Sequence, residues 1–285
     1  MAGPPTDPMD QVHRYLRGAV EVVPARDAAT VVLLRDGVEG LEVYLLRRRT
    51  SMAFGAGMHV FPGGSVDARD RDESVGWVGP APSVWAEQLS CDADLARSLV
   101  CAAVRETFEE SGILLASHAD GTMVGDTTGD DWEADRLALI EGALSLSEFL
   151  GRRSLVLRAD LLRCWAHWIT PEWLSRRFDT RFFVAAVPGG QQTRDVGGEA
   201  DHVAWLRVDE AVALHRDGAL TLMTATAVTL RELSGHADVS SALAAERRVS
   251  PVMRRAVVVD GDVHLVYDTE PDPQPLAGPP QPPPA

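Results

Sequence analysis

The stretch LARSLVCAAVRETFEESGI, from Leu95 to Ile113, decides how the chain folds. With about 100° of rotation per residue, three carboxylates fall within one arc of roughly 100° on a helix, those of Glu106, Glu109 and Glu110. Arg105 lies at the edge of that arc, beside Glu109. Apolar side chains point the other way, so the stretch predicts a helix with one face in a core and one acidic face.

The acidic face needs an explanation, because neighbouring like charges destabilise a helix by roughly 0.2–0.5 kcal/mol per pair. A divalent cation would neutralise the face, and hard oxygen ligands suit Mg²⁺ or Mn²⁺. The alternative is an acidic face that is solvated and binds nothing. The charges alone leave both interpretations open.

A second motif, FPGG at residues 61–64, lies upstream of the helix. Together with RETFEESG at residues 105–112 it resembles the Nudix box, in which a glycine is followed by five residues, Glu, seven residues and then R-E-U-x-E-E-x-G-U. Gly64 takes the first position, and Asp70 stands where the pattern has its first Glu. Arg105 follows Gly64 by 41 positions instead of the pattern's 14, so the box carries an insertion of 27 residues.

A box interrupted in this way and entered through HVFPGG resembles the Nudix branch that contains peroxisomal coenzyme A diphosphatases. The resemblance implies an α/β fold, a Nudix-type α/β/α sandwich, over residues 27–268. We expect the insertion at about residues 65–92 and a C-terminal helical addition at about residues 219–268. Residues 1–26 are expected to form a weakly ordered lead-in, and the Pro-rich residues 269–285 a disordered tail.

The same resemblance implies a metal-dependent hydrolase site with Mg²⁺ or Mn²⁺ as cofactor. The expected metal ligands are three carboxylates and one backbone carbonyl, those of Glu106, Glu109, Glu110 and Gly64. Arg105 is expected to orient a carboxylate through a charge-assisted hydrogen bond. Two candidates stay open for the general base, Glu106 and the loop residue Glu199, with Asp201 second to Glu199 in its loop.

The residues before the FPGG motif partly match a signature of coenzyme A diphosphatases. Arg48, Gly57 and Phe61 occupy signature positions, Arg49 stands at a small-residue position, and Ala53 replaces a second arginine. We expect the first four of these residues to form the substrate-binding set, in which the two arginines hold phosphate groups. The alternative is a charged strand end that is exposed to solvent.

The resemblance implies an enzyme that hydrolyses the diphosphate bond of a nucleoside diphosphate linked to another group. Coenzyme A or an acyl-CoA is the leading substrate, with 3′,5′-ADP and (acyl-)phosphopantetheine as products. The alternatives are a diphosphatase for NADH or ADP-ribose and a nucleotide-sensing module without turnover. The carboxylates of the helix favour the enzyme, because a sensor has no need to keep them.

Composition restricts the partners of this 285-residue chain. Its net charge of −15 argues against nucleic acid as a partner. All 27 basic residues are arginines, which suit bidentate binding of phosphate groups in a small-molecule nucleotide. The three cysteines show no CxxC spacing, and no run of 18 apolar residues occurs. We therefore expect a cytoplasmic protein without a membrane partner, and the sequence leaves a homodimer open.

Periodicity and turn residues predict the other elements. Apolar, β-branched runs predict strands at residues 28–34, 41–46, 254–259 and 262–267. Helical spacing predicts helices at residues 131–150, with an interruption at Gly142, 220–234 and 239–248. The two last strands flank Asp260-Gly261, which predicts a hairpin.

Overall fold

The computed structural model describes residues 8–51, 55–194 and 200–268 of the chain. The chain divides into two compact units. The large unit comprises residues 28–166 and 181–249, and the small unit comprises residues 1–27, 167–180 and 250–285. Three of the boundaries fall inside strands, β1 (Arg26–Gly37), β8 (Arg163–Ile169) and β9 (Phe178–Ala186).

The large unit is built on a sheet with the strand order β10-β2-β1-β9-β8. The strands predicted at residues 28–34 and 41–46 are confirmed as β1 (Arg26–Gly37) and β2 (Gly40–Arg48), which pair as an antiparallel hairpin. β10 (Ala200–Arg207) pairs with β2 and extends this hairpin. Two short strands also pair with the hairpin, β3 (His59–Val60) with β2 and β4 (Gly63–Ser65) with β1. Four consecutive residues of β1, 31–34, are fully buried, so this strand is covered on both faces.

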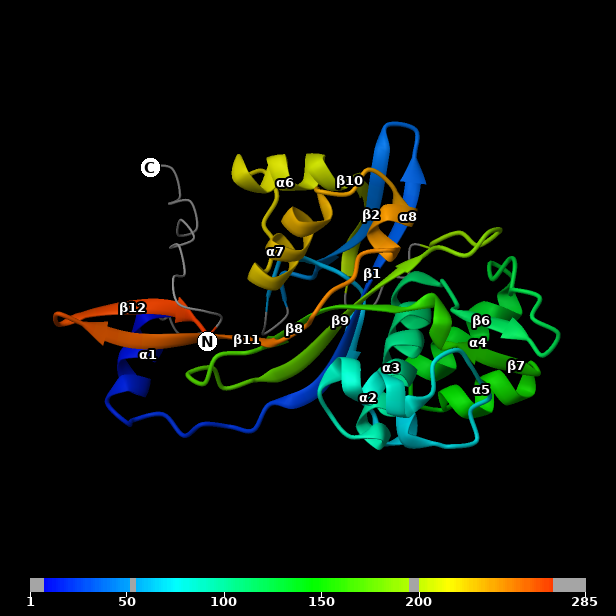
Figure 1. The fold of residues 1–285 in the computed structure, drawn as a ribbon, viewed down its shortest axis with the longest axis horizontal. Helices are drawn as coiled ribbons and strands as arrows, with labels where there is room; N and C mark the ends of the chain where they lie inside the picture. Colours follow the sequence, from blue (N-terminus) through cyan, green and yellow to red (C-terminus); the bar gives the residue numbers. More distant parts are fainter. Residues whose placement is uncertain (1–7, 52–54, 195–199, 269–285) are drawn as a thin grey trace. The chain divides into compact units, whose positions relative to one another are not determined.

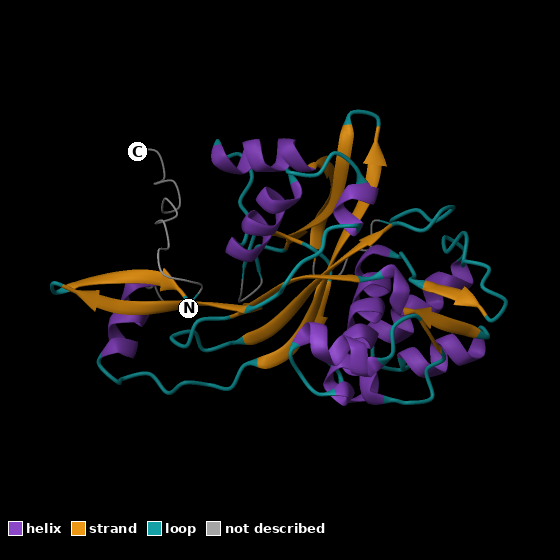
Figure 2. Ribbon diagram, in the orientation of Figure 1, coloured by secondary structure: helices purple, strands orange, loops and turns teal. Residues whose placement is uncertain are grey.

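Helices cover both faces of this sheet, as Figures 1 and 2 show. α3 (Ala93–Ser111) packs on one face against Ala29, Val31 and Leu33 of β1. α6 (Val208–Arg216) and α7 (Thr224–Leu233) lie on the other face (Figure 1). The predicted α/β/α sandwich is therefore confirmed.

The insertion in the box is built into the large unit. It contains a 3₁₀ turn, a short strand and a helix: η1 (Ala68–Arg71), β5 (Trp77–Val78) and α2 (Pro82–Leu89). Trp85 of α2 is buried and meets Phe183 edge to face, with ring centroids 5.7 Å apart. α2 packs beside α3.

A second sheet, which local sequence patterns did not predict, holds β5 in place. Its strand order is β5-β7-β6, with β7 (Leu155–Arg158) in the centre and β6 (Ala116–His118) at the far edge. Trp77 of β5 is paired with Leu157 of β7 in parallel. Partners so distant along the chain cannot be recognised from the period of a short strand.

Three of the predicted helices have different lengths in the structure. The pattern at 131–150 is interrupted at Gly142, whose φ of 70° is left-handed, and gives α4 (Asp130–Ile140) and α5 (Leu146–Arg152). α7 and α8 (Val239–Leu243) are shorter than predicted. The residues before α7 form no helix because the chain there pairs with β3, where His59 N donates to Thr221 O at 2.8 Å.

The small unit contains α1 (Pro8–Leu16) and the hairpin of β11 (Pro251–Val259) and β12 (Asp262–Tyr267). The hairpin confirms the prediction, and both Asp260 and Gly261 at its turn have positive φ. β11 also pairs in parallel with the end of β8.

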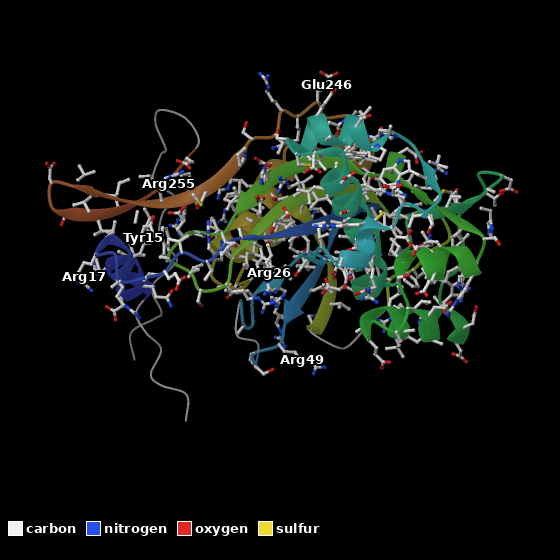
Figure 3. The ribbon with its side chains drawn as sticks, turned by 90° about the horizontal axis from the view of Figure 1, so that it is seen from below. Tyr15, Arg17, Arg26, Arg49, Glu246 and Arg255 are labelled. Carbon is white, nitrogen blue, oxygen red and sulfur yellow. The ribbon has the colours of Figure 1, made fainter. Side chains whose placement is uncertain are left out.

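Side chains around α1 join the segments of the small unit. Tyr15 lies 6.1 Å from Trp173 by ring centroids, and its hydroxyl donates to Glu172. Figure 3 shows Tyr15 on α1 and Arg255 on β11, where Arg255 is paired with Asp268 at 2.5 Å. Within the described residues, no helix has the length and apolar character needed to span a membrane.

Candidate active site

The C-terminal half of α3 carries the acidic residues of the site. Its helix is defined at both ends, because the side chain of Asp92 accepts a hydrogen bond from Leu95 N at 2.8 Å and Gly112 ends it with a left-handed φ of 75°. Thirteen residues of α3 are buried, which fixes the rotation of the helix about its axis. The side chains of Glu106 and Glu109 are therefore largely buried, with 13% and 11% of their surface exposed.

Arg105 is the centre of a buried network of ion pairs. Its Nε and Nη2 donate to the two carboxylate oxygens of Asp70, both at 3.0 Å. Its Nη1 donates to Glu106 at 2.8 Å and to Glu109 at 3.2 Å, and Nη2 also reaches Ser65 O at 3.0 Å. Only 10% of the arginine side chain and 1% of that of Asp70 are exposed. One guanidinium thus holds three carboxylates in fixed positions.

The box glycines lie directly against this acidic face. Gly63 N donates to Oε2 of Glu110 at 2.7 Å. A methyl group at Gly64 would lie 2.6 Å from Cδ of Glu106, so a side chain at this position would displace the Glu106 carboxylate. β4 places both glycines, since Gly64 is paired with Ala29 of β1. The two halves of the interrupted box are therefore adjacent in space.

The electrostatics of the site show excess negative charge. Burial raises the pKa of Glu106 to about 7; Arg105 opposes this shift and Glu109 adds to it. Burial also raises the pKa of Glu109, again opposed by Arg105. The single arginine does not offset the cost of burying these carboxylates together. A divalent cation would stabilise their ionised forms, and their oxygens are the donors that Mg²⁺ and Mn²⁺ prefer.

The predicted substrate-binding residues lie on the segment that joins β2 to the FPGG motif. Arg48 and Arg49 lie at the end of β2, where Gly57 N donates to Arg48 O at 2.9 Å; the side chain of Arg49 is exposed (Figure 3). Phe61 is buried, with its ring edge to face on Phe182. Glu199 lies outside the described residues. In the part of the chain that is described, no three His, Cys, Asp or Glu residues are grouped as a metal site.

Sequence patterns did not point to one buried residue that contacts the acidic helix. Arg136 of α4 donates from Nη1 to the main-chain oxygen of Glu109 at 2.6 Å, and only 2% of the residue is exposed. An arginine in a polar helix carries no signal of such a role. Asp70 did have a signal, its position in the box, and the structure shows it as the partner of Arg105.

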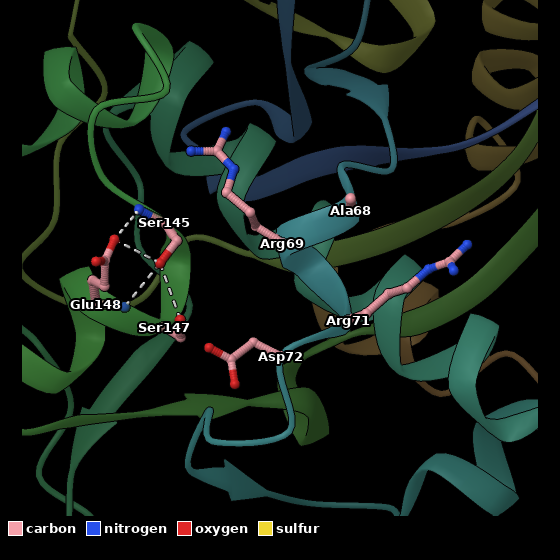
Figure 4. Close-up of a pocket in the computed structure, with 7 residues that line it drawn as sticks. All are labelled: Ala68, Arg69, Arg71, Asp72, Ser145, Ser147 and Glu148. Carbon is pink, nitrogen blue, oxygen red and sulfur yellow. Dashed lines mark hydrogen bonds between the residues drawn. The ribbon is translucent and has the colours of Figure 1, made fainter.

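A polar pocket lies on the outer side of η1, shown in Figure 4. Its volume is about 530 Å³, and its lining is made of Ala68, Arg69, Arg71, Asp72, Ser145, Ser147 and Glu148. Arg69 is bound to Asp67 and to Gly142 O, and Glu148 to the capping residue Ser145. The hydrogen bonds of Arg69 thus stabilise the turn at η1, and those of Glu148 stabilise the start of α5.

Comparisons with known proteins find similarity to Nudix hydrolases. A family model described as the NUDT19 Nudix domain matches residues 86–231. The putative nudix hydrolase 7 of Caenorhabditis elegans is 28% identical over 192 residues, 66% of this chain and 55% of its own length. The acyl-coenzyme A diphosphatase NUDT19 of Xenopus laevis is 26% identical over 213 residues, 62% of this chain and 56% of its own length.

The human acyl-coenzyme A diphosphatase NUDT19 is 27% identical over 277 residues, 81% of this chain and 72% of its own length. The chain spans about half the length of the worm and frog relatives. Among solved structures, the crystal structure of a NUDIX hydrolase from Alicyclobacillus acidocaldarius matches with a TM-score of 0.67 and 27% identity. That match covers 80% of this chain and 99% of the other.

Proposed function

The chain belongs to the Nudix hydrolase family, and from that premise we propose that it hydrolyses the diphosphate bond of a nucleoside diphosphate linked to another group. The proposed substrate is coenzyme A or an acyl-CoA. One water molecule is consumed as a P–O bond of the diphosphate breaks, and the products are 3′,5′-ADP and (acyl-)phosphopantetheine. The names of the frog and human relatives, acyl-coenzyme A diphosphatases, support this substrate, as does the partial signature at Arg48, Gly57 and Phe61.

One observation carries the proposal. Arg105 binds Asp70, Glu106 and Glu109 at once, beside the backbone of Gly63 and Gly64. A purely structural acidic face would be solvated, whereas these carboxylates are buried at a cost that raises the pKa of two of them. Burying like charges next to a glycine backbone is the arrangement expected of a site that takes a cation and a phosphate.

The residues that would hold Mg²⁺ or Mn²⁺ are Glu106, Glu109, Glu110 and the carbonyl of Gly64. When bound, such an ion polarises phosphoryl oxygens and lowers the pKa of water. Arg105 keeps Glu106 and Glu109 at a fixed separation, so the ligands are oriented before substrate arrives. Arg48 and Arg49 would bind phosphate groups of the substrate.

Two carboxylates are candidates to accept the proton of the attacking water. Glu106 has a pKa of about 7, and a base works best when its pKa is near the working pH. A bound cation would lower that pKa, which favours Glu199 as base. Glu199→Gln distinguishes the two: loss of kcat without loss of metal affinity identifies Glu199 as the base, whereas unchanged kcat favours Glu106.

The test is a panel of substrates incubated with Mg²⁺, with Mn²⁺ and with EDTA, and analysed by the masses of the products. We expect coenzyme A to give 3′,5′-ADP only when metal is present, and Glu110→Gln to abolish the reaction. Hydrolysis of NADH or ADP-ribose alone would overturn the coenzyme A assignment and keep the diphosphatase. Nucleotide binding without turnover on any compound would identify a sensor instead.

A further inference from the structure

The C-terminal end of α3 is held by residues from outside the box, through two side chains and one main-chain N–H. A helix leaves its last carbonyls without partners inside the helix. Here the oxygen of Glu109 accepts from Arg136 Nη1 at 2.6 Å, and that of Ser111 from Arg194 N at 3.0 Å. The oxygen of Gly112 accepts from Thr127 Oγ1 at 2.8 Å. Three separate segments thus cap the turn that bears Glu109 and Glu110.

Glu133 joins the two arginines at this end of the helix. Its Oε1 and Oε2 accept from Arg136 Nη2 at 2.7 Å and Nε at 2.9 Å, a bidentate pair. Its Oε2 also accepts from Arg194 Nη1. These hydrogen bonds and both arginines lower the pKa of Glu133, and its pairing with Arg136 comes first among the causes. The carboxylate is therefore ionised near neutral pH and holds both guanidinium groups.

Arg194 is fixed from its other side as well. Its Nη2 donates to Thr127 O at 2.9 Å, and its own carbonyl accepts from the buried Tyr44 hydroxyl at 3.2 Å. Its aliphatic stem lies on Gly112, where a methyl group would come within 2.6 Å of Cγ. The arginine thus leaves no room for a side chain at the residue that ends the helix.

We infer that the Arg136–Glu133–Arg194 network positions the last turn of α3 and so sets the geometry of the Glu109 and Glu110 carboxylates. Arg136 and Arg194 are positioning residues in this inference, which rests on the proposed function. Two positive charges at a helix C-terminus also complement the helix dipole. A small rotation of this turn would move both carboxylates relative to Gly63 and Gly64, which β4 holds in place.

The test compares Arg136→Gln with a matched control, Arg153→Gln, an arginine at the end of α5 that also binds α4. Arg153 is bound to Asp135 and stacks on Trp132 at 3.6 Å, so its loss loosens α4 without touching the main chain of α3. Mn²⁺ affinity is measured by calorimetry without substrate, kcat and KM with coenzyme A and Mg²⁺, and Tm by circular dichroism.

We expect Arg136→Gln to weaken Mn²⁺ binding and to lower kcat, each about 10- to 100-fold, because loss of groups that orient metal ligands has this effect. KM should stay within about twofold, since the network contacts no proposed substrate residue. Arg136→Lys should restore part of both, because it keeps one donor for Glu109 O. Arg153→Gln should leave Mn²⁺ affinity and kcat within about twofold of the wild type, although its Tm should fall about as much as that of Arg136→Gln.

A folded Arg136→Gln protein with unchanged Mn²⁺ affinity and kcat would overturn the inference, as would equal losses in Arg153→Gln. If Arg136→Gln does not fold, Glu133→Gln is measured in its place, with a severalfold loss of Mn²⁺ affinity expected and no loss overturning the inference. Wild-type protein that binds no Mn²⁺ and hydrolyses nothing would contradict the proposed function itself. The two failures are therefore distinguishable.

Discussion

Arg105 of α3 holds both carboxylate oxygens of Asp70 at 3.0 Å, although Asp70 lies in the insertion, 35 positions earlier in the chain. Asp70 stands where the box pattern has a glutamate, and η1 compensates for its shorter side chain by bringing the main chain close to α3. Asp67 caps that turn, and its own backbone N–H donates to Asp70 at 2.8 Å. One buried ion pair thus joins the insertion to the helix that carries the second half of the box.

The first prediction concerns this pair. Asp70→Asn should lower the free energy of unfolding by about 1.5–3 kcal/mol, because the buried guanidinium of Arg105 loses its bidentate, charge-assisted hydrogen bonds to Asp70. Urea denaturation followed by tryptophan fluorescence measures the change. Asp67→Asn is the control on the same turn; its side chain is 38% exposed, and its loss should cost less than about 1 kcal/mol. Equal effects of the two substitutions would show that burial of the pair does not matter.

The second prediction concerns the contact between Gly64 and Glu106. Gly64→Ala should lower kcat/KM about 10²-fold, because the added methyl group would displace a carboxylate of the site by an ångström or so. Steady-state kinetics with coenzyme A and Mg²⁺ measures it. The matched control is Gly125→Ala, where a methyl group meets no atom within 4 Å. Full activity of Gly64→Ala would argue that Glu106 does not need its present position.

The third prediction is a pH dependence of stability in EDTA. The pKa of Glu106 is about 7 in the folded protein, above its ordinary 4.5, so the folded state binds this proton more tightly than the unfolded state. The free energy of unfolding should therefore fall as pH rises from about 4.5 to 7, by on the order of 2 kcal/mol from this group. It should not change further above that range.

Glu106→Gln isolates the contribution of this group. The free energy of unfolding of this variant should fall less than that of the wild type as pH rises through this range. Denaturation curves at pH 5 and pH 7 give the difference between the two proteins. Adding Mg²⁺ should reduce the fall in the wild type, because a bound cation favours the ionised carboxylate. A wild type that gains stability over this range relative to Glu106→Gln would contradict the prediction.

The elements that the sequence predicted are those fixed by local patterns. The period of α3, the glycine at its end and the apolar runs of β1 and β2 are all local, and the structure confirms them. The pairing of β5 with β7 and the contact of Arg136 with Glu109 O are long-range, and no period or spacing predicts them. The sequence predicted that Gly64 lies beside the acidic helix only through the resemblance to the Nudix box, which contains both.

The last prediction tests which phosphate Arg48 contacts. Its main-chain N–H and carbonyl hold the turn through Met58 O and Gly57 N, and replacing the side chain keeps these main-chain hydrogen bonds. If Arg48 binds the 3′-phosphate of coenzyme A, Arg48→Gln should raise KM for coenzyme A about 10- to 100-fold, since a charge-assisted hydrogen bond contributes about 1.5–3 kcal/mol. KM for dephospho-coenzyme A, which lacks that group, should be unchanged. Equal increases for both substrates would place Arg48 at the diphosphate instead, and no increase for either would remove it from the substrate-binding set.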